Sequence, residues 1–390
     1  MKYQHGGDIY TNSVTMDYSA NINPLGLPEG VKQALHEAAE NCSCYPDSRS
    51  MKLRQALAKF HDLSPEKIIC GNGAADLIFQ VVQAIKPVNA ILLAPSFLEY
   101  EQALKAVSCH IFYYDLKKEQ DFKLKERDLE DWIRLSEISF QMIFLCNPNN
   151  PTGFALNKEE LLRFLDFCKR EGIFCVVDEC FNEFLQEPES YSVLEAVRSG
   201  KYDHVFLLKA FTKIYAMAGL RLGYGLCSGL KVLEEMNRLR QPWSVSSLAQ
   251  AAGAAALKEK AYVERTRALI TCERGFLKAN LSALGLSVFD SMANYIFFQD
   301  MRSQAQKEEK LLYEQLLSQK VLIRSCSNYR GLDGTYYRIC VKQRKENEEF
   351  LSVLKSILTG GRPYGKDDHD TGDHVQCGEK SDCGRLVPHI

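Results

Sequence analysis

A lysine and an arginine near the middle of the chain have the types and spacing that suggest chemistry. Lys213 follows the apolar run VFLL at 205–208, and Arg221 lies eight residues later inside the glycine-rich segment GLRLGYG. A lysine next to a buried strand loses hydration, which lowers its proton affinity and makes its amine nucleophilic toward carbonyl groups. An arginine offers a planar guanidinium that suits a phosphate. Pyridoxal 5'-phosphate (PLP) presents both an aldehyde and a phosphate, although from spacing alone the two residues could be ordinary surface cations.

The elements that must position these residues alternate along the chain. Apolar runs at 90–94, 111–114, 142–146, 173–177, 205–208 and 222–226 are separated by helical or looped stretches. The clearest helix is expected at 158–171, with Asn157 and Glu160 as a capping box and Gly172 past its end. Strands that are apolar throughout and separated by helices are typical of an α/β fold with a mostly parallel sheet.

Three polar residues follow three of these apolar runs. Asn150 comes after the run that ends at Cys146, Asp178 after the run that ends at Val177, and Lys213 after VFLL. Taken singly they could be a turn residue, a strand-end cap and a surface lysine. Because ligands of such folds bind at the carboxyl ends of the strands, we expect the three to meet at one site.

Two glycine-containing segments could bind anions. Small residues at 71–76 open a helix at about 77–85, so a phosphate could approach the helix N-terminus, although a plain turn is the commoner explanation. Near the start of the chain, His5-Gly6-Gly7 could surround an anion with backbone N–H groups, or could simply be a frayed terminus.

Composition excludes several classes of protein. The 390 residues are 46% hydrophobic and 25% charged, as in an ordinary globular protein, and the net charge of −2 provides no field for nucleic acid or anionic membranes. The N-terminus lacks the apolar core of a signal peptide and no apolar run reaches spanning length, so we expect a cytoplasmic location. Several of the fourteen cysteines lie inside apolar strands, which indicates reduced, buried thiols.

We expect four segments in the chain. They are an N-terminal arm with part of a small domain (1–44), a large PLP-binding domain (45–255), a C-terminal α+β domain (256–361) and a tail (362–390). A long helical region over 247–281, a helix over 307–319 and a final helix over 346–358 are predicted in the second half. In the tail, a disordered segment is the favoured interpretation; the alternative is a metal site formed by His369, His374, Cys377 and Cys383, although their spacing matches no regular zinc finger.

Four ordered motifs, PNNPTG, DECFNEF, KAFTK and GLRLGYG, together resemble those of the class I/II aminotransferase family, a fold-type I PLP group. The resemblance extends from about residue 3 to residue 360. It implies a large domain with a mostly parallel sheet of the seven-stranded type, a smaller α+β domain and a homodimer with shared active sites. The segments HGG, SANINPLG, PWSV and LIRSC point, within the family, to a branch that decarboxylates phosphorylated amino acids.

The resemblance also implies roles for individual residues. Lys213 would bond covalently to the cofactor aldehyde, and Asp178 would pair with the pyridinium nitrogen. Asn150 would hydrogen-bond the ring oxygen, and Phe97 would stack on the ring. The cofactor phosphate would be bound by Gly73, Ala74, Thr212 and Arg221, and by Tyr45 of the partner subunit.

On the substrate side, Arg338 matches the arginine that binds the substrate carboxylate. The candidates for the substrate phosphate and its surroundings are His5, Gly6, Arg324 and Asn21. Two positions depart from the wider family: Ala210 replaces a frequent phosphate-binding serine, and Phe181 replaces a tyrosine that bonds the ring oxygen. Both suggest altered tuning of the cofactor.

The reaction implied is decarboxylation of O-phospho-L-threonine to (R)-1-aminopropan-2-ol phosphate in cobalamin biosynthesis. Alternatives are decarboxylation of O-phospho-L-serine, amino transfer from histidinol phosphate, and, from a different class, a non-catalytic binding protein that keeps the fold.

Overall fold

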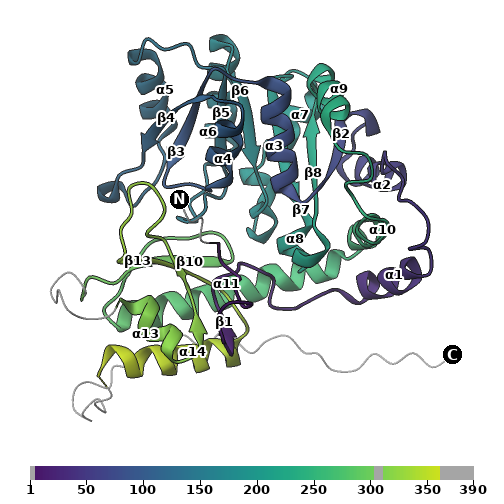
Figure 1. Ribbon diagram of the computed structural model, residues 1–390. Helices are drawn as coiled ribbons and strands as arrows, with labels where there is room; N and C mark the ends of the chain where they lie inside the picture. The colour runs from purple at the N-terminus through teal and green to yellow at the C-terminus, as the bar shows by residue number, and fades with distance from the viewer. Residues whose placement is uncertain (1–4, 303–310, 361–390) are drawn as a thin grey trace.

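The computed structural model describes residues 5–302 and 311–360, which form a larger and a smaller sheet with helices packed around them, and a separate pair of short strands (Figure 1). The larger sheet has seven strands in the order β2-β8-β7-β6-β5-β3-β4. Their bounds are β2 Ile68–Asn72, β3 Asn89–Ala94, β4 His110–Asp115, β5 Met142–Cys146, β6 Phe174–Asp178, β7 Val205–Ala210 and β8 Leu222–Cys227. Only β8 runs antiparallel to its neighbours in this sheet, so the predicted mostly parallel sheet is confirmed.

Helices cover both faces of this sheet, which explains why its strands are apolar throughout. On β6, Cys175 and Val177 share a cluster of buried residues with α5 (Glu126–Leu135), α6 (Lys158–Glu171) and α7 (Leu194–Ser199). Val176 points the other way, into a cluster with α3 (Ala74–Ile85), α4 (Glu99–Ala106) and α9 (Leu230–Leu239). This alternation of side chains decides which strand residues are buried away from the site and which approach it.

The capping residues in the sequence predicted the bounds of α6 correctly. α6 spans Lys158–Glu171, and its N-terminus carries the expected capping box: Asn157 accepts from the Glu160 N–H at 3.0 Å, and Glu160 accepts from the Asn157 N–H at 2.8 Å. Gly172 follows with a positive φ of 71°, the conformation that favours glycine after a helix.

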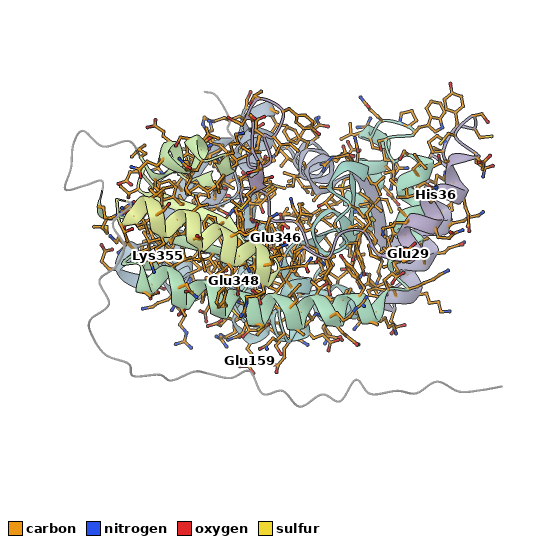
Figure 2. The ribbon with its side chains drawn as sticks, turned by 90° about the horizontal axis from the view of Figure 1, so that it is seen from below. Glu29, His36, Glu159, Glu346, Glu348 and Lys355 are labelled. Carbon is orange, nitrogen blue, oxygen red and sulfur yellow. The ribbon has the colours of Figure 1, made fainter. Side chains whose placement is uncertain are left out.

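The smaller sheet is antiparallel, in the order β12-β13-β10-β9. Its strands are β9 Ser287–Val288, β10 Tyr295–Gln299, β12 Arg324–Ser325 and β13 Tyr336–Cys340, and a separate parallel pair joins β1 (Met16–Asp17) to β11 (Val321–Leu322). Helices α11 (Lys260–Ala283), α13 (Leu312–Ser318) and α14 (Arg344–Leu358) accompany it. Figure 2 shows α14, which carries the labelled Glu346, Glu348 and Lys355, lying beside α11; Glu273 of α11 joins the two through Arg344 at 3.0 Å.

The helical region predicted over 247–281 is confirmed, and the chain forms two helices there. α10 spans Ser247–Ala256 and α11 starts at Lys260. α10 packs tightly on the large sheet, since a Cβ on Gly253 would lie 2.5 Å from a methyl carbon of Leu222, whereas α11 extends beneath both sheets (Figure 1). No glycine or proline marks the break at 257–259, so the sequence offers no local signal for it.

The other helices are α1 (Glu29–Ala39), α2 (Met51–His61) and the single turn α8 (Phe211–Ile214). Short 3-10 turns occupy Pro65–Lys67, Lys118–Gln120, Asn182–Phe184, Pro188–Tyr191 and Ala218–Leu220. The helix predicted over 307–319 is seen as α13, and its first residues lie outside the described chain.

We propose the domain boundaries expected from the sequence: 1–44, 45–255, 256–361 and 362–390. The larger sheet is made entirely of strands between Ile68 and Cys227, which supports the second segment. The first segment contacts both parts, because β1 pairs with β11 while α1 packs against α10. Among the described residues the twelve cysteines form no disulfide with one another, and no helix has the length and apolar character needed to cross a bilayer.

Candidate active site

A cavity of about 320 Å³ lies where β5, β6 and β7 end, between the two sheets. The N-terminal segment and the smaller sheet complete its wall. Twelve of the residues singled out from the sequence line it: His5, Gly6, Asn21, Ala74, Phe97, Asn150, Asp178, Thr212, Lys213, Arg221, Arg324 and Arg338. The expected meeting of Asn150, Asp178 and Lys213 at one edge of the sheet is therefore seen.

Lys213 lies on the single turn α8, directly after β7. Burial, together with the positive charges of Arg338 and Arg221, lowers the pKa of its amine to about 8. Much more of this amine is neutral near pH 7 than in an ordinary lysine, so it can attack an aldehyde.

Asp178, the last residue of β6, is buried at the floor of the cavity. Its carboxylate accepts a hydrogen bond from the Tyr100 hydroxyl at 2.7 Å and another from the Cys180 N–H at 2.9 Å. Burial raises the pKa of Asp178, while these hydrogen bonds and the charge of Lys213 oppose that rise. A carboxylate held in this way suits the protonated nitrogen of a pyridine ring.

Tyr100 was missed by sequence reasoning. It comes one helical turn after Phe97, and the two rings meet edge to face with centroids 5.5 Å apart; Tyr100 also stacks on Phe144 at 4.6 Å. The motif PSFLEY contains the signal, because residues three apart at a helix start lie on one side.

Replacing Tyr100 with phenylalanine is expected to weaken PLP binding about tenfold, because Asp178 loses a hydrogen bond that favours its charged form. The dissociation constant of PLP, measured by absorbance titration of the apoprotein, checks this. Tyr114→Phe is the control, since that ring packs against Trp132 outside the cavity. An unchanged dissociation constant in Tyr100→Phe would contradict the assignment.

An anion cradle lies at the start of α3. Gly73 has a φ of +83°, and a Cβ there would lie 2.5 Å from the Nη2 atom of Arg221, so only glycine lets the guanidinium lie against this helix end. A Cβ on Gly223 would lie 2.5 Å from the Ala74 nitrogen, which shows how closely β8 approaches the same point. The free N–H groups of the first helical turn and Arg221 suit a phosphate.

Several buried polar atoms in the cavity have no hydrogen-bond partner among the described residues. They are both amide atoms of Asn21 and the Nε atom of Arg338. The other guanidinium nitrogens of Arg338 donate to the Ser19 carbonyl at 2.8 Å and to the Asn150 Oδ1 atom. Buried donors without partners are unfavourable, so these atoms indicate that a polar ligand completes the site.

PLP fits this donor set. An amine of lowered pKa, a buried carboxylate and a helix N-terminus with an adjacent arginine face one cavity, and each matches a different part of the cofactor. Ala210 and Phe181 also line the cavity, and the Phe181 ring packs edge to face on Tyr295 at 5.1 Å without any hydroxyl to offer.

Gly73 and Tyr45 do not line the cavity. Gly73 lies just behind it, in contact with Arg221. Tyr45 is 81% exposed and stacks on Trp243 at 4.8 Å, away from the cavity of its own chain, so its role in a partner's site stays a prediction. The tail candidates His369, His374, Cys377 and Cys383 lie outside the described residues.

The fold and the site define a PLP enzyme of the aminotransferase type, and the chain belongs to the aminotransferase class I and II family, whose sequence profile matches residues 13–354. Enzymes of this family use PLP, so the predicted cofactor and the predicted fold are confirmed.

Individual relatives are similar to this chain over most of its length. The threonine-phosphate decarboxylase of Salmonella typhimurium is 35% identical over 368 residues, which cover 92% of this chain and 98% of that protein. An adenosylcobalamin biosynthesis bifunctional protein of Leptospira interrogans is 28% identical over 393 residues. This aligned region covers 98% of this chain and 44% of that protein. The crystal structure of the histidinol-phosphate aminotransferase of Clostridium acetobutylicum superposes with a TM-score of 0.79 at 29% identity, covering 88% of this chain and 99% of that one.

Proposed function

We propose that the protein is a PLP-dependent decarboxylase of O-phospho-L-threonine, which releases carbon dioxide and (R)-1-aminopropan-2-ol phosphate for cobalamin biosynthesis. The 35% identity to a threonine-phosphate decarboxylase over nearly the whole chain supports this activity. The Leptospira relative named for adenosylcobalamin biosynthesis supports the pathway.

One observation in the structure carries the proposal: three arginines line the cavity around Lys213. Arg221, beside the N-terminus of α3, is in place for the cofactor phosphate. Arg324 and Arg338 remain for a substrate with two further anionic groups, which a phosphorylated amino acid has.

When bound, PLP supplies an aldehyde that joins an amine and a ring that accepts the electron pair released at Cα. Lys213 would hold that aldehyde through its buried amine. Asp178, oriented by Tyr100, would pair with the ring nitrogen. Asn150 and Phe97 would orient the ring.

The residues that bind the substrate decide which bond at its Cα breaks. Arg338 binds the carboxylate, with Asn21 as a second polar contact, and thereby orients the bond between Cα and the carboxylate. His5, Gly6 and Arg324 bind the phosphate. After carbon dioxide leaves, Lys213 would donate one proton to Cα, where the new C–H bond replaces the broken bond to the carboxylate.

A product assay tests the proposal. PLP-loaded protein is incubated with O-phospho-L-threonine, with and without 2-oxoglutarate, and carbon dioxide, amine phosphate and glutamate are measured. Equal amounts of carbon dioxide and amine phosphate without 2-oxoglutarate are the expected result. Glutamate without carbon dioxide would overturn it.

The second candidate is a histidinol-phosphate aminotransferase, favoured by the solved relative of that name. It requires 2-oxoglutarate, and the same assay separates the two activities. A decarboxylase of O-phospho-L-serine differs from the main proposal by one methyl group, and a pocket discriminates a methyl group by about 1–3 kcal/mol. Measuring kcat/KM for both phosphoamino acids decides between them.

Deleting residues 1–7 is expected to raise KM for O-phospho-L-threonine about tenfold, because His5 and Gly6 line the cavity and provide phosphate contacts. Steady-state kinetics measure this effect. Deletion of residues 1–4 alone keeps His5 and is the control. A KM equal to that of the full chain would contradict a role for His5.

The same proposal includes a cytoplasmic homodimer in which Tyr45 reaches the cofactor phosphate of the partner subunit. The exposed stack of Tyr45 on Trp243 supports it, because large exposed aromatic side chains are typical of interfaces. Analytical ultracentrifugation measures the assembly.

A further inference from the structure

A carboxylate in the cavity has no role in the chemistry above. Glu99, the first residue of α4, lines the cavity and has a side chain only 14% exposed. Its Oε1 atom lies 3.1 Å from the Nδ1 atom of His5. Its Oε2 atom is buried and has no hydrogen-bond partner in the part of the chain that the structure describes.

The surroundings of Glu99 are cationic. Burial raises the pKa of this carboxyl, and the charges of His5, Lys213 and Arg324 oppose that rise. A carboxylate in this position repels a doubly anionic substrate. Its presence is therefore favourable only if it has a second role that offsets this repulsion. Its direct contact with His5 indicates what that role is.

His5 belongs to a segment that is wedged against the cavity. The Gly7 N–H donates to the Ser19 hydroxyl at 2.6 Å, and a Cβ on Gly6 would lie 2.2 Å from the Ser19 carbonyl oxygen. The same carbonyl accepts from Arg338 at 2.8 Å, so this segment and the substrate arginine share one anchor.

A second hollow, of about 540 Å³, lies on the other side of the same segment. It shares His5, Gly6, Ser19 and Arg324 with the first cavity and adds Asp8 and Tyr313 from the outside. Residues 5–7 are therefore the wall between the two hollows, and what holds this wall decides whether the first cavity is closed at that end.

We propose that Glu99 is a positioning residue for recognition of the substrate phosphate: it anchors His5 and keeps residues 5–7 closed over the phosphate end of the cavity. The contact with Glu99 uses Nδ1, which leaves the Nε2–H of the doubly protonated ring as the donor to a phosphate. This inference rests on the proposed function for the identity of the substrate.

A double-mutant cycle tests whether Glu99 acts through His5. Glu99→Ala and His5→Ala are each expected to raise KM for O-phospho-L-threonine about tenfold and to leave kcat within twofold. The double variant is expected to be no worse than His5→Ala alone. Glu99→Gln, which keeps an oxygen that accepts from Nδ1, is expected to recover most of the affinity.

Glu101→Ala is the matched control, because it removes a carboxylate from the same turn of α4 that pairs with Lys105 instead of facing the cavity. Its KM is expected to equal that of the unmodified protein. Circular dichroism and thermal unfolding of each variant establish that the fold is intact.

Three results would overturn the inference: an unchanged KM in Glu99→Ala, additive effects of the two substitutions, or a fall in kcat alone. Binding of inorganic phosphate to the PLP-loaded protein, followed by calorimetry, separates its failure from that of the proposed function. Weaker phosphate binding in Glu99→Ala supports the anchoring role even if O-phospho-L-threonine is not decarboxylated, and equal binding refutes it.

Discussion

Replacing Lys213 with alanine is expected to abolish covalent attachment of PLP and to lower turnover at least about 10³-fold. The substitution removes both the amine that binds the aldehyde and the group that returns a proton to Cα, and positioned proton transfer alone contributes about 10²–10⁴-fold. Reduction with borohydride followed by mass spectrometry measures the attachment, and the carbon dioxide assay measures the turnover. Lys59→Ala, at an exposed position on α2, is the control.

The pH dependence of the attachment provides a second measurement on the same residue. Burial, with Arg338 and Arg221, lowers the pKa of Lys213 to about 8, and only the neutral amine attacks an aldehyde. The rate at which PLP attaches to the apoprotein is therefore expected to rise about tenfold per pH unit below pH 7 and to level off above about pH 8. A rate that continues to rise beyond pH 10 would show that the amine behaves as an ordinary lysine.

Replacing Lys209 with methionine is expected to lower the free energy of unfolding by about 3–5 kcal/mol. Lys209 lies on β7 with its side chain buried, 3.1 Å from Glu179 and 3.0 Å from Glu183, and Arg267 also reaches Glu183 at 2.9 Å. Without the ammonium group, the Glu179 carboxylate is left buried beside Glu183 with no cation of its own. Guanidinium denaturation measures the loss, with Lys59→Met as the surface control.

The pH determines the charges of Lys209 and its carboxylate partners, and with them the size of this effect. Although burial opposes it, Glu183 and Glu179 raise the pKa of Lys209, and Lys209 lowers the pKa of Glu183. The Lys209–Glu183 pair is thus ionised near pH 7, and the stability it contributes is lost as falling pH protonates Glu183 or as very high pH deprotonates Lys209. Burial raises the pKa of Glu179, so falling pH protonates Glu179 before Glu183. A decrease of less than about 1 kcal/mol in the free energy of unfolding at pH 7 would mean that water solvates the Glu179 carboxylate once the ammonium group is removed.

The Lys209 cluster lies behind the active site because strand side chains alternate. Asp178 and Glu179 are neighbours, yet Asp178 faces the cavity and Glu179 faces Lys209 on the other side. Both lysines after the same apolar run were visible in the sequence, as Lys209 and Lys213. Alternation along β7 gives one of them a structural position and the turn α8 gives the other a position in the cavity.

Local pattern alone determined much of this protein. The apolar runs predicted six of the seven strands of the larger sheet, β3 to β8, and the capping box with Gly172 predicted both ends of α6. Asn150, Asp178 and Lys213 could be assigned to one site because each follows a buried strand, and parallel strands end at a common edge. These features depend on neighbours in sequence, so the residues themselves carry the signal.

Only the tertiary structure decided how distant residues pair. Tyr100 orients Asp178, Arg338 contacts both Asn150 and the Ser19 carbonyl, and Glu99 reaches His5, although these partners lie far apart along the chain. The end of α10 before α11 is decided in the same way, because α10 packs on the larger sheet and α11 extends beneath both. Such contacts depend on strand register and on how the two sheets meet around the cavity, and no spacing within one segment encodes them.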